Sequence, residues 1–183
     1  KLSAVCALLV LYYFSLPRII FSSPYSSVVE SSEGELLAAK IASDGQWRFP
    51  IQDSLPYKFR QAIVYFEDEY FQYHFGFNPI AMGKAFTQNV TAKKKVRGAS
   101  TLTQQVIRLS RKNTNRTYFE KGIELILATR LEFRHSKKDI LRLYAAHAPF
   151  GGNIVGVEMA SWRYFGLPPS QLSWAEAATL AVL

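Results

Sequence analysis

Cysteine is nearly absent from this chain, which has one cysteine, Cys6, and three histidines among its 183 residues. A single cysteine excludes a disulfide framework within the chain, and no cysteine and histidine spacing typical of a zinc finger is present. No internal repeat is visible. By contrast, 49% of the residues are hydrophobic and 14% are aromatic, which argues against disorder. The length favours one globular domain.

Charge is missing from the beginning of the chain. Residues 2–16 carry no charged side chain, and a helix of that length reaches about 22 Å. The hydrocarbon core of a membrane is about 30 Å thick, but the apolar residues 19–21 can extend the run. We therefore expect residues 1–21 to form an N-terminal transmembrane helix. A cleaved signal peptide and a buried soluble helix are the alternatives, and the lack of a small-residue cleavage site favours the anchor.

The predicted secondary structure of the remaining sequence changes once, from strand to helix. Residues 22–50 contain short β-prone runs, which predict a linker with a segment of two or three strands. Residues 51–183 show helical periodicity, so we expect a mainly α-helical domain. Capping patterns predict helices over residues 55–71, 100–111, 117–134, 136–148 and 153–165, and others beginning at 79 and 174. The last helix reaches Leu183 without a cap, so we expect the domain to continue beyond it.

Positive charge is concentrated in the middle of the chain. Residues 84–142 contain 15 Lys and Arg but 4 Asp and Glu, a net charge of +11, whereas the rest of the chain carries −3. Such a segment predicts an anionic partner: lipid phosphate, a membrane surface or nucleic acid. Because the apolar N-terminus indicates a membrane and no nucleic-acid recognition motif is present, we expect no nucleic acid partner.

Three clusters of residues could carry chemistry, and the first is E-D-E-Y-F-Q-Y-H-F-G at residues 67–76. The consecutive carboxylates Glu67, Asp68 and Glu69 cannot all share one helix face, so at least one has a different environment. A carboxylate that aromatic side chains desolvate can act as a general acid or base. The alternative is an acidic helix end whose aromatic residues belong to the core.

The second cluster is G-A-S-T-L-T-Q-Q at residues 98–105, which enters a predicted helix. Free backbone N–H groups at a helix start attract anions. A polar stripe then follows at helical spacing and ends in a cation; it comprises Thr101, Gln104, Gln105 and Arg108. An ordinary solvated helix face is the alternative.

The third cluster contains Arg116, Lys121 and Glu124. Lys121 and Glu124 are three residues apart and therefore share a helix face. They could form a surface ion pair of little energetic value. They could instead place a cation and a carboxylate beside a phosphate, directly or through Mg²⁺.

Together these clusters resemble the motifs of glycosyltransferase family 51, the peptidoglycan glycosyltransferases of class A penicillin-binding proteins and monofunctional transglycosylases. The resemblance covers about residues 28–183, and the five motifs occur in order at residues 67–76, 98–105, 121–124, 140–151 and 160–166. The sequences A-P-F-G-G-N and A-S-W within the last two motifs particularly resemble the penicillin-binding protein 1C branch.

The resemblance implies a fold and a reaction. The expected fold is a lysozyme-like helical lobe with a small membrane-proximal lobe, held at the periplasmic or extracellular face of the cytoplasmic membrane by a single span. The expected reaction polymerises lipid II into β-1,4-linked glycan strands, with inversion and release of undecaprenyl pyrophosphate. The implied partners are lipid II, the growing glycan on undecaprenyl pyrophosphate, membrane lipid and other cell-wall synthesis proteins. Aromatic residues between Phe71 and Phe86 are expected to contact lipid.

The resemblance also implies roles for individual residues. Glu67 matches the catalytic general base, and Glu124 matches a second glutamate near the departing pyrophosphate and its divalent metal, Mg²⁺ or Mn²⁺. The residues expected to bind substrate are Asp68, Ser100, Thr101, Gln104, Gln105, Arg108, Arg116 and Lys121.

This sequence departs from the family pattern at four places. Arg108 stands where lysine is usual, Glu120 where a basic residue is common, Ala146 where asparagine is usual, and Leu167 where lysine is common. A catalytically impaired scaffold of the same fold is therefore one alternative. A lysozyme-like glycan hydrolase is another, although hydrolysis does not explain the phosphate-type cations.

Overall fold

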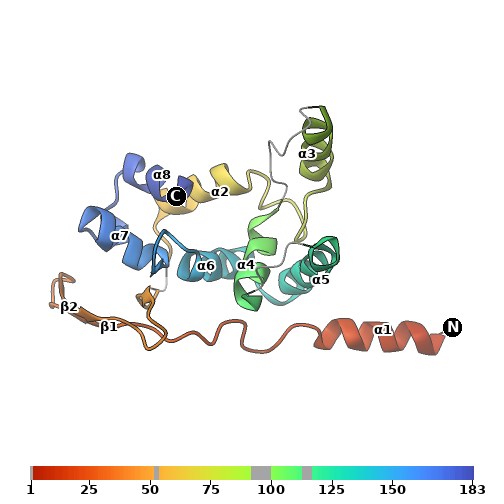
Figure 1. Cartoon of the computed structure of the whole chain (residues 1–183), viewed down its shortest axis with the longest axis horizontal. Coiled ribbons are helices and arrows are strands. Elements are labelled where there is room, and N and C mark those ends of the chain that lie inside the picture. The colour runs from red at the N-terminus through yellow and green to blue at the C-terminus, as the bar shows by residue number, and fades with distance from the viewer. Residues whose placement is uncertain (1, 52–53, 92–99, 113–116) are drawn as a thin grey trace. The chain divides into compact units, whose positions relative to one another are not determined.

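The structure, a computed structural model, describes residues 2–51, 54–91, 100–112 and 117–183, apart from the side chains of residues 85, 86 and 88–90. The described residues are mainly α-helical with two small sheets, which confirms the predicted class (Figure 1). The helices are α1 (Leu2–Phe14), α2 (Tyr57–Glu67), α3 (Pro79–Thr91), α4 (Leu102–Arg111), α5 (Tyr118–Arg134), α6 (Lys137–His147), α7 (Val157–Phe165) and α8 (Trp174–Val182), with a 3-10 turn η1 (Pro169–Gln171). The strands are β1 (Ser27–Glu30), β2 (Leu36–Lys40), β3 (Trp47–Arg48) and β4 (Ile154–Val155).

The chain divides into two compact units. The first unit contains residues 1–20 and 70–140, and the second contains residues 21–69 and 141–183. The core of the first unit lies between α4 and α5, which pack against each other. Its fully buried side chains, at helical spacing on each helix, include Leu102, Val106, Ile107, Ala128 and Leu131. This packing positions the polar residues of α4 next to those of α5.

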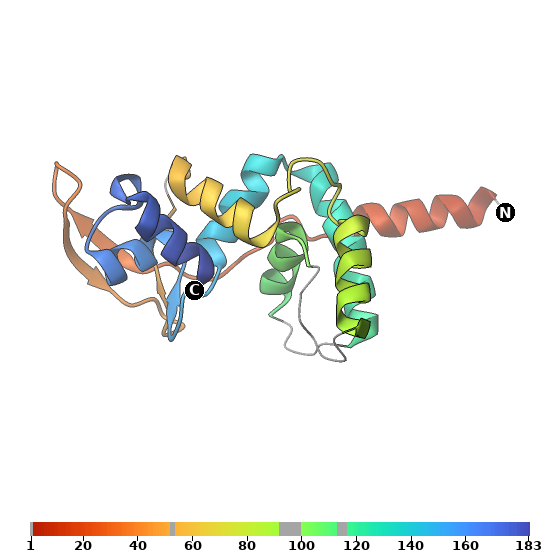
Figure 2. The same cartoon turned by 90° about the horizontal axis from the view of Figure 1, so that it is seen from above.

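Helix α1 belongs to the first unit, and all of its described residues remain unburied. Figures 1 and 2 both show it leading away from α5 with no helix of its unit alongside. Its end is held by α5: the hydroxyls of Tyr12 and Thr129 are 3.0 Å apart, and Arg130 Nε donates to the carbonyl of Tyr13 at 3.1 Å.

The transmembrane helix predicted over residues 1–21 is not seen. Helix α1 has 13 residues, which corresponds to about 20 Å. It ends at Phe14, and Pro17 cannot continue a helix because it lacks a backbone N–H. Among the residues that the structure describes, no helix is both long enough and apolar enough to cross a membrane.

In the second unit, α2 and α8 lie side by side (Figure 1). Their contact is apolar: Phe59 and Ile63 of α2 and Ala177 and Leu180 of α8 are all buried. Strands β1 and β2 form an antiparallel hairpin, whereas β3 pairs in parallel with β4. Helix α2 is thus fixed along its length and ends at Glu67.

Most predicted helix starts are confirmed because they depend on local hydrogen bonds. Ser173 and Glu176 form the expected reciprocal capping box, and Asn78 accepts the backbone N–H of Ala81 at 2.9 Å. The helix predicted over residues 153–165 is wrong at its start, because residues 154–155 form β4 instead. Helix α7 begins after Gly156, whose φ of +85° brings it against the backbone carbonyl of Ala146.

Candidate functional site

The start of α4 differs by one residue from the prediction. Thr101, rather than Ser100, caps the helix: its side chain accepts the backbone N–H of Gln104 at 3.2 Å. The hydroxyl of Ser100 is therefore available for another contact. It accepts a hydrogen bond of 3.2 Å from Nη2 of Arg108, two turns further along the helix.

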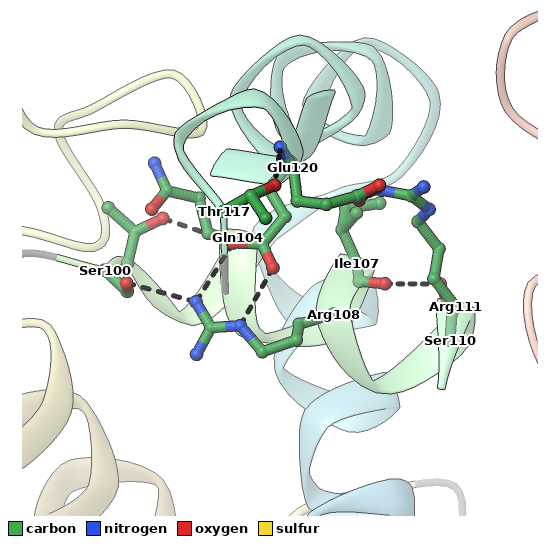
Figure 3. A network of polar contacts seen from close by, with 10 residues as sticks. Ser100, Gln104, Ile107, Arg108, Ser110, Arg111, Thr117 and Glu120 are labelled. Carbon is green, nitrogen blue, oxygen red and sulfur yellow. Dashed lines mark hydrogen bonds and ion pairs between the residues drawn. The ribbon is translucent and has the colours of Figure 1, made fainter. Parts of the chain in front are cut away.

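The ion pair between Arg108 and Glu124 is the centre of this site. Figure 3 shows Arg108 together with Ser100, to which a dashed line connects it. Nε of Arg108 donates to Oε1 of Glu124 at 2.9 Å, and Nη2 donates to Oε2 at 3.0 Å. Such a two-point contact fixes the plane of the guanidinium as well as its distance. The hydrogen bonds that Arg108 donates to Glu124 raise the pKa of Arg108 and favour its charged form. We call Ser100, Arg108 and Glu124 the Arg108 cluster.

The burial of the cluster leaves part of the arginine accessible. Of the Glu124 side chain 11% is exposed, compared with 28% of the Arg108 side chain. Within the described part of the chain, Nη1 of Arg108 makes no hydrogen bond. Among the described residues, Nη1 is therefore a cationic donor of fixed orientation, because Glu124 and Ser100 hold the Nε and Nη2 edge of the guanidinium.

Gln104 and Thr101 lie on the same helix but are buried. Both are 2% exposed, and Oε1 of Gln104 has no hydrogen-bond partner among the described residues. A buried acceptor without a partner costs free energy, which is typical of a position that meets a ligand or water. Gln105 is half-buried on the next position of α4.

Lys121, another predicted cation, does not join the cluster. Lys121 is exposed on α5, and the carboxylate of Glu124 pairs with Arg108 rather than with Lys121. Arg116 lies outside the described residues. Glu120 contributes its backbone N–H to the cap of α5 and its carboxylate to an ion pair of 2.7 Å with Arg111 (Figure 3). The negative charge of Glu120 is thus matched by a neighbouring cation.

The acidic residues of the first motif lie in the second unit, at the end of α2. Glu67 is the last helical residue and is half-buried, Asp68 is 7% exposed, and Glu69 is exposed. The prediction that at least one of the three consecutive carboxylates has a different environment is confirmed. Asp68 leaves the helix with φ −159° and ψ 72°, while its N–H still bonds to the carbonyl of Val64.

Tyr144 on α6 is a neighbour of Glu67 that the sequence did not single out as functional. It is 8% exposed. Burial raises the pKa of the Tyr144 phenol, and the negative charge of Glu67 acts in the same direction. The phenol therefore stays neutral, and toward a carboxylate it acts as a hydrogen-bond donor. Its place within the fourth motif was the one available signal.

The fit of a metal ion depends on Glu124. No group of three or more His, Cys, Asp or Glu side chains that could hold a metal occurs among the described residues. Glu124 supplies the only carboxylate of the Arg108 cluster. Proteins commonly hold Mg²⁺ by one or two carboxylates together with substrate phosphates. The residues thus fit a metal shared with a bound pyrophosphate better than a cage built by the protein alone.

Comparison with known proteins identifies the family. The family model described as Transglycosylase matches residues 33–183. The chain belongs to the transglycosylase family, and the family predicted from the five motifs is confirmed.

Several curated relatives are similar over most of the chain. The chain is 41% identical to "Penicillin-binding protein 1C" of Escherichia coli (strain K12) over 158 residues, which are 85% of the chain and 20% of that protein. It is 43% identical to "Biosynthetic peptidoglycan transglycosylase" of Citrobacter koseri over 122 residues, which are 67% of the chain and 50% of that protein. The protein of the same name from Salmonella arizonae is 41% identical over 122 residues. The chain thus spans a fifth to a half of the length of these relatives.

Proposed function

We propose that the chain is the transferase part of a peptidoglycan glycosyltransferase that polymerises lipid II. The observation that carries this proposal is the Arg108 cluster, a guanidinium anchored on one edge by Glu124 and Ser100 whose Nη1 makes no hydrogen bond to another described residue. A planar cation of fixed orientation suits phosphate oxygens. The transglycosylase family and the names of the relatives agree with this substrate class.

The reaction needs a base and a site for the leaving group. The 4-hydroxyl of the acceptor lipid II attacks the anomeric carbon of the donor glycan, and Glu67 takes the hydroxyl proton. The new C–O bond forms on the face opposite the pyrophosphate, so the configuration inverts, and undecaprenyl pyrophosphate leaves with the bonding electrons. Arg108, with Arg116 and Lys121, stabilises the charge that develops on this leaving group. Ser100, Thr101, Gln104 and Gln105 shape the substrate cleft between donor and acceptor, and Asp68, next to the base in the sequence, also belongs to the substrate-binding residues.

A divalent metal, Mg²⁺ or Mn²⁺, is part of the proposal. Glu124 would hold it together with the donor pyrophosphate, where a metal neutralises negative charge. Arg108 orients the Glu124 carboxylate, because it contacts both oxygens. The site of action is the outer face of the cytoplasmic membrane, where the unburied apolar surface of α1 meets lipid.

The proposal is tested with labelled lipid II and Mg²⁺ in detergent, comparing the unaltered chain with Glu67→Gln. We expect glycan ladders from the unaltered chain and a loss of roughly 10²-fold or more in Glu67→Gln, because the base is removed. Glu69→Gln, a change at the neighbouring exposed carboxylate, is the matched control and should retain the ladders. A folded chain that forms no ladders would favour the scaffold alternative, and release of soluble fragments from cell-wall sacculi would favour a hydrolase.

A further inference from the structure

A partly buried ion pair lies in the first unit, outside the residues assigned to catalysis. Lys137 is the first residue of α6, and its Nζ lies 2.8 Å from Oε1 of Glu132 near the end of α5. Only 3% of the Glu132 side chain and 22% of the Lys137 side chain are exposed. Removing two charges from water costs free energy that their attraction does not always return. Stability alone is therefore a weak reason for this pair, and its other contacts suggest a different one.

The pair connects two segments that carry sequence motifs. Nζ of Lys137 donates a second hydrogen bond, of 2.7 Å, to the carbonyl of His74, and it lies 4.5 Å from the centre of the Phe71 ring. Oε1 of Glu132 also accepts a hydrogen bond of 2.6 Å from the hydroxyl of Thr103. Thr103 is fully buried in the first turn of α4. The segment of residues 71–76 is thus tied to the start of α4 through a chain of three hydrogen bonds.

A second tie joins the same two segments independently. The hydroxyl of Thr101 donates a hydrogen bond of 2.8 Å to the carbonyl of Gly76, while it caps α4. Gly76 also lies directly against α5, because a Cβ added there would be 2.7 Å from the carbonyl carbon of Ala128. The first turn of α4 is therefore held at both of its buried threonines, and Gln104 and Arg108 follow on the same helix.

We propose that Lys137 and Glu132 are positioning residues for glycosyl transfer. They hold the first turn of α4 against residues 71–76, and so keep Arg108 in the orientation that binds the donor pyrophosphate and Gln104 in its place in the substrate cleft. This inference rests on the proposed function of the Arg108 cluster. Neither residue is assigned a contact with substrate, so their effect is transmitted through Thr103 and the His74 carbonyl.

The test separates positioning from stability with a double variant. Lys137→Met and Glu132→Gln, made singly, each leave one buried group without its partner and should lower the melting temperature. The double variant buries no charge, and its glutamine can still accept from Thr103, so much of the melting temperature should return. Its kcat for lipid II polymerisation should nevertheless stay lower by roughly tenfold to hundredfold, because misplaced binding groups are costly to catalysis. Lys137→Arg, which keeps the positive charge, should retain much of the rate. Lys138→Met, at the adjacent exposed lysine, should change neither the melting temperature nor kcat.

Hydrogen exchange provides a readout that does not depend on activity. The amides of residues 71–76 and 101–104 should exchange faster in the double variant than in the unaltered chain, and Lys138→Met should leave them unchanged. A folded double variant with unaltered kcat, or with unaltered exchange in both segments, would overturn the inference. An unaltered chain that cannot polymerise lipid II would reject the proposed function, and exchange would still decide whether the pair holds the segments together.

Discussion

Arg108 contacts both carboxylate oxygens of Glu124, through Nε at 2.9 Å and Nη2 at 3.0 Å, from a neighbouring helix. The contact shows what an arginine contributes at this position, where the resemblance leads us to expect lysine. A lysine is a point charge, whereas the arginine fork uses one edge for Glu124 and keeps a further donor. Glu124 therefore acts as an anchor for the cation as well as a candidate metal ligand.

The first prediction concerns the geometry of Arg108. Arg108→Met should lower the initial rate of lipid II polymerisation by roughly 10²-fold, because the charge at the leaving group is lost. It should also destabilise the fold by about 1–2 kcal/mol, because the poorly exposed Glu124 loses its partner. Urea unfolding and polymerisation rates measure the two effects.

Arg108→Lys is the control for charge without the fork. The rate should stay within about tenfold of that of the unaltered chain. The ammonium group supplies the same charge, but it cannot make the two-point contact of a guanidinium. Adding Glu124→Gln to Arg108→Met should recover stability without recovering the rate. Equal rates for the methionine and lysine variants would contradict a role of the Arg108 charge at the pyrophosphate.

The second prediction concerns Gly76, whose φ is +84° and whose added Cβ would lie 2.7 Å from backbone atoms of Ala128. Gly45 has a similar φ of +74°, but a Cβ there meets open space. Gly76→Ala and Gly45→Ala share the strain of a positive φ, of about 1 kcal/mol. Gly76→Ala also overpacks the segment against a helix backbone. Because overpacking a core costs about 1–3 kcal/mol, the unfolding free energy of Gly76→Ala should be lower than that of Gly45→Ala by this amount.

Urea unfolding of the two variants measures this difference directly. Similar losses for both glycines would show that the segment of residues 71–76 does not lie against α5 as closely as the structure has it. Gly83→Ala, within α3 and with no atom within reach of an added Cβ, is the reference for a substitution without strain, and it should stabilise the fold by about 0.5–1 kcal/mol because alanine is the better helix former.

Local sequence patterns predicted most helix starts correctly. Features that depend on contacts between distant residues could not be predicted in this way. The capping box at Ser173 and Glu176 depends on four consecutive residues, so its pattern sufficed. Strand β4 exists because Ile154 pairs with Trp47, a partner more than a hundred residues away that no local pattern reveals. The helix predicted from residue 153 therefore begins late.

The candidate site shows the same division. Spacing within one helix suggested that Glu124 pairs with Lys121, but the packing of α4 on α5 gives it Arg108 instead. The lipid-contacting aromatics were predicted as a group, yet Phe71 is fully buried whereas Phe75 is 44% exposed. Sequence resemblance supplied the residue roles, while contacts between helices decided which side chains meet.

The third prediction concerns acid stability and His147. Its ring stacks on Phe21 with centroids 3.6 Å apart. Burial lowers the pKa of His147, and the positive charge of Arg48 acts in the same direction, against the hydrogen bond to the Leu143 carbonyl. The unfolded chain therefore binds the proton more readily, with a pKa of about 6.5. The stability that this histidine contributes is complete above that value and is lost as the pH falls through the lowered folded pKa.

His147→Phe keeps an aromatic ring on Phe21 but cannot be protonated. The unfolding free energy of this variant should fall less between about pH 7.5 and about pH 5 than that of the unaltered chain. Some acid dependence should remain, because burial also lowers the pKa of His135. Identical pH profiles for the variant and the unaltered chain, measured by urea unfolding, would rule out His147 as a source of acid sensitivity.

The fourth prediction concerns the surface of the first unit that we propose contacts lipid. The rings of Phe75 and Phe133 meet edge to face at 4.4 Å although 44% and 68% of these residues are exposed, and Phe133 also contacts Tyr12 near the end of α1. Exposed aromatic side chains beside an unburied apolar helix are typical of a surface that binds a membrane or another protein. If this surface enters lipid, replacing both phenylalanines by serine removes apolar area worth about 2 kcal/mol or more.

Vesicles of phosphatidylglycerol and phosphatidylcholine provide the measurement. Phe75→Ser combined with Phe133→Ser should weaken vesicle binding by at least about tenfold, because each 1.4 kcal/mol is a factor of ten. Trp174→Ser, which removes an aromatic ring that is 54% exposed in the second unit, should bind vesicles like the unaltered chain. The opposite ranking would place the lipid contact on the second unit, and unchanged binding in both variants would leave α1 alone as the membrane-contacting element.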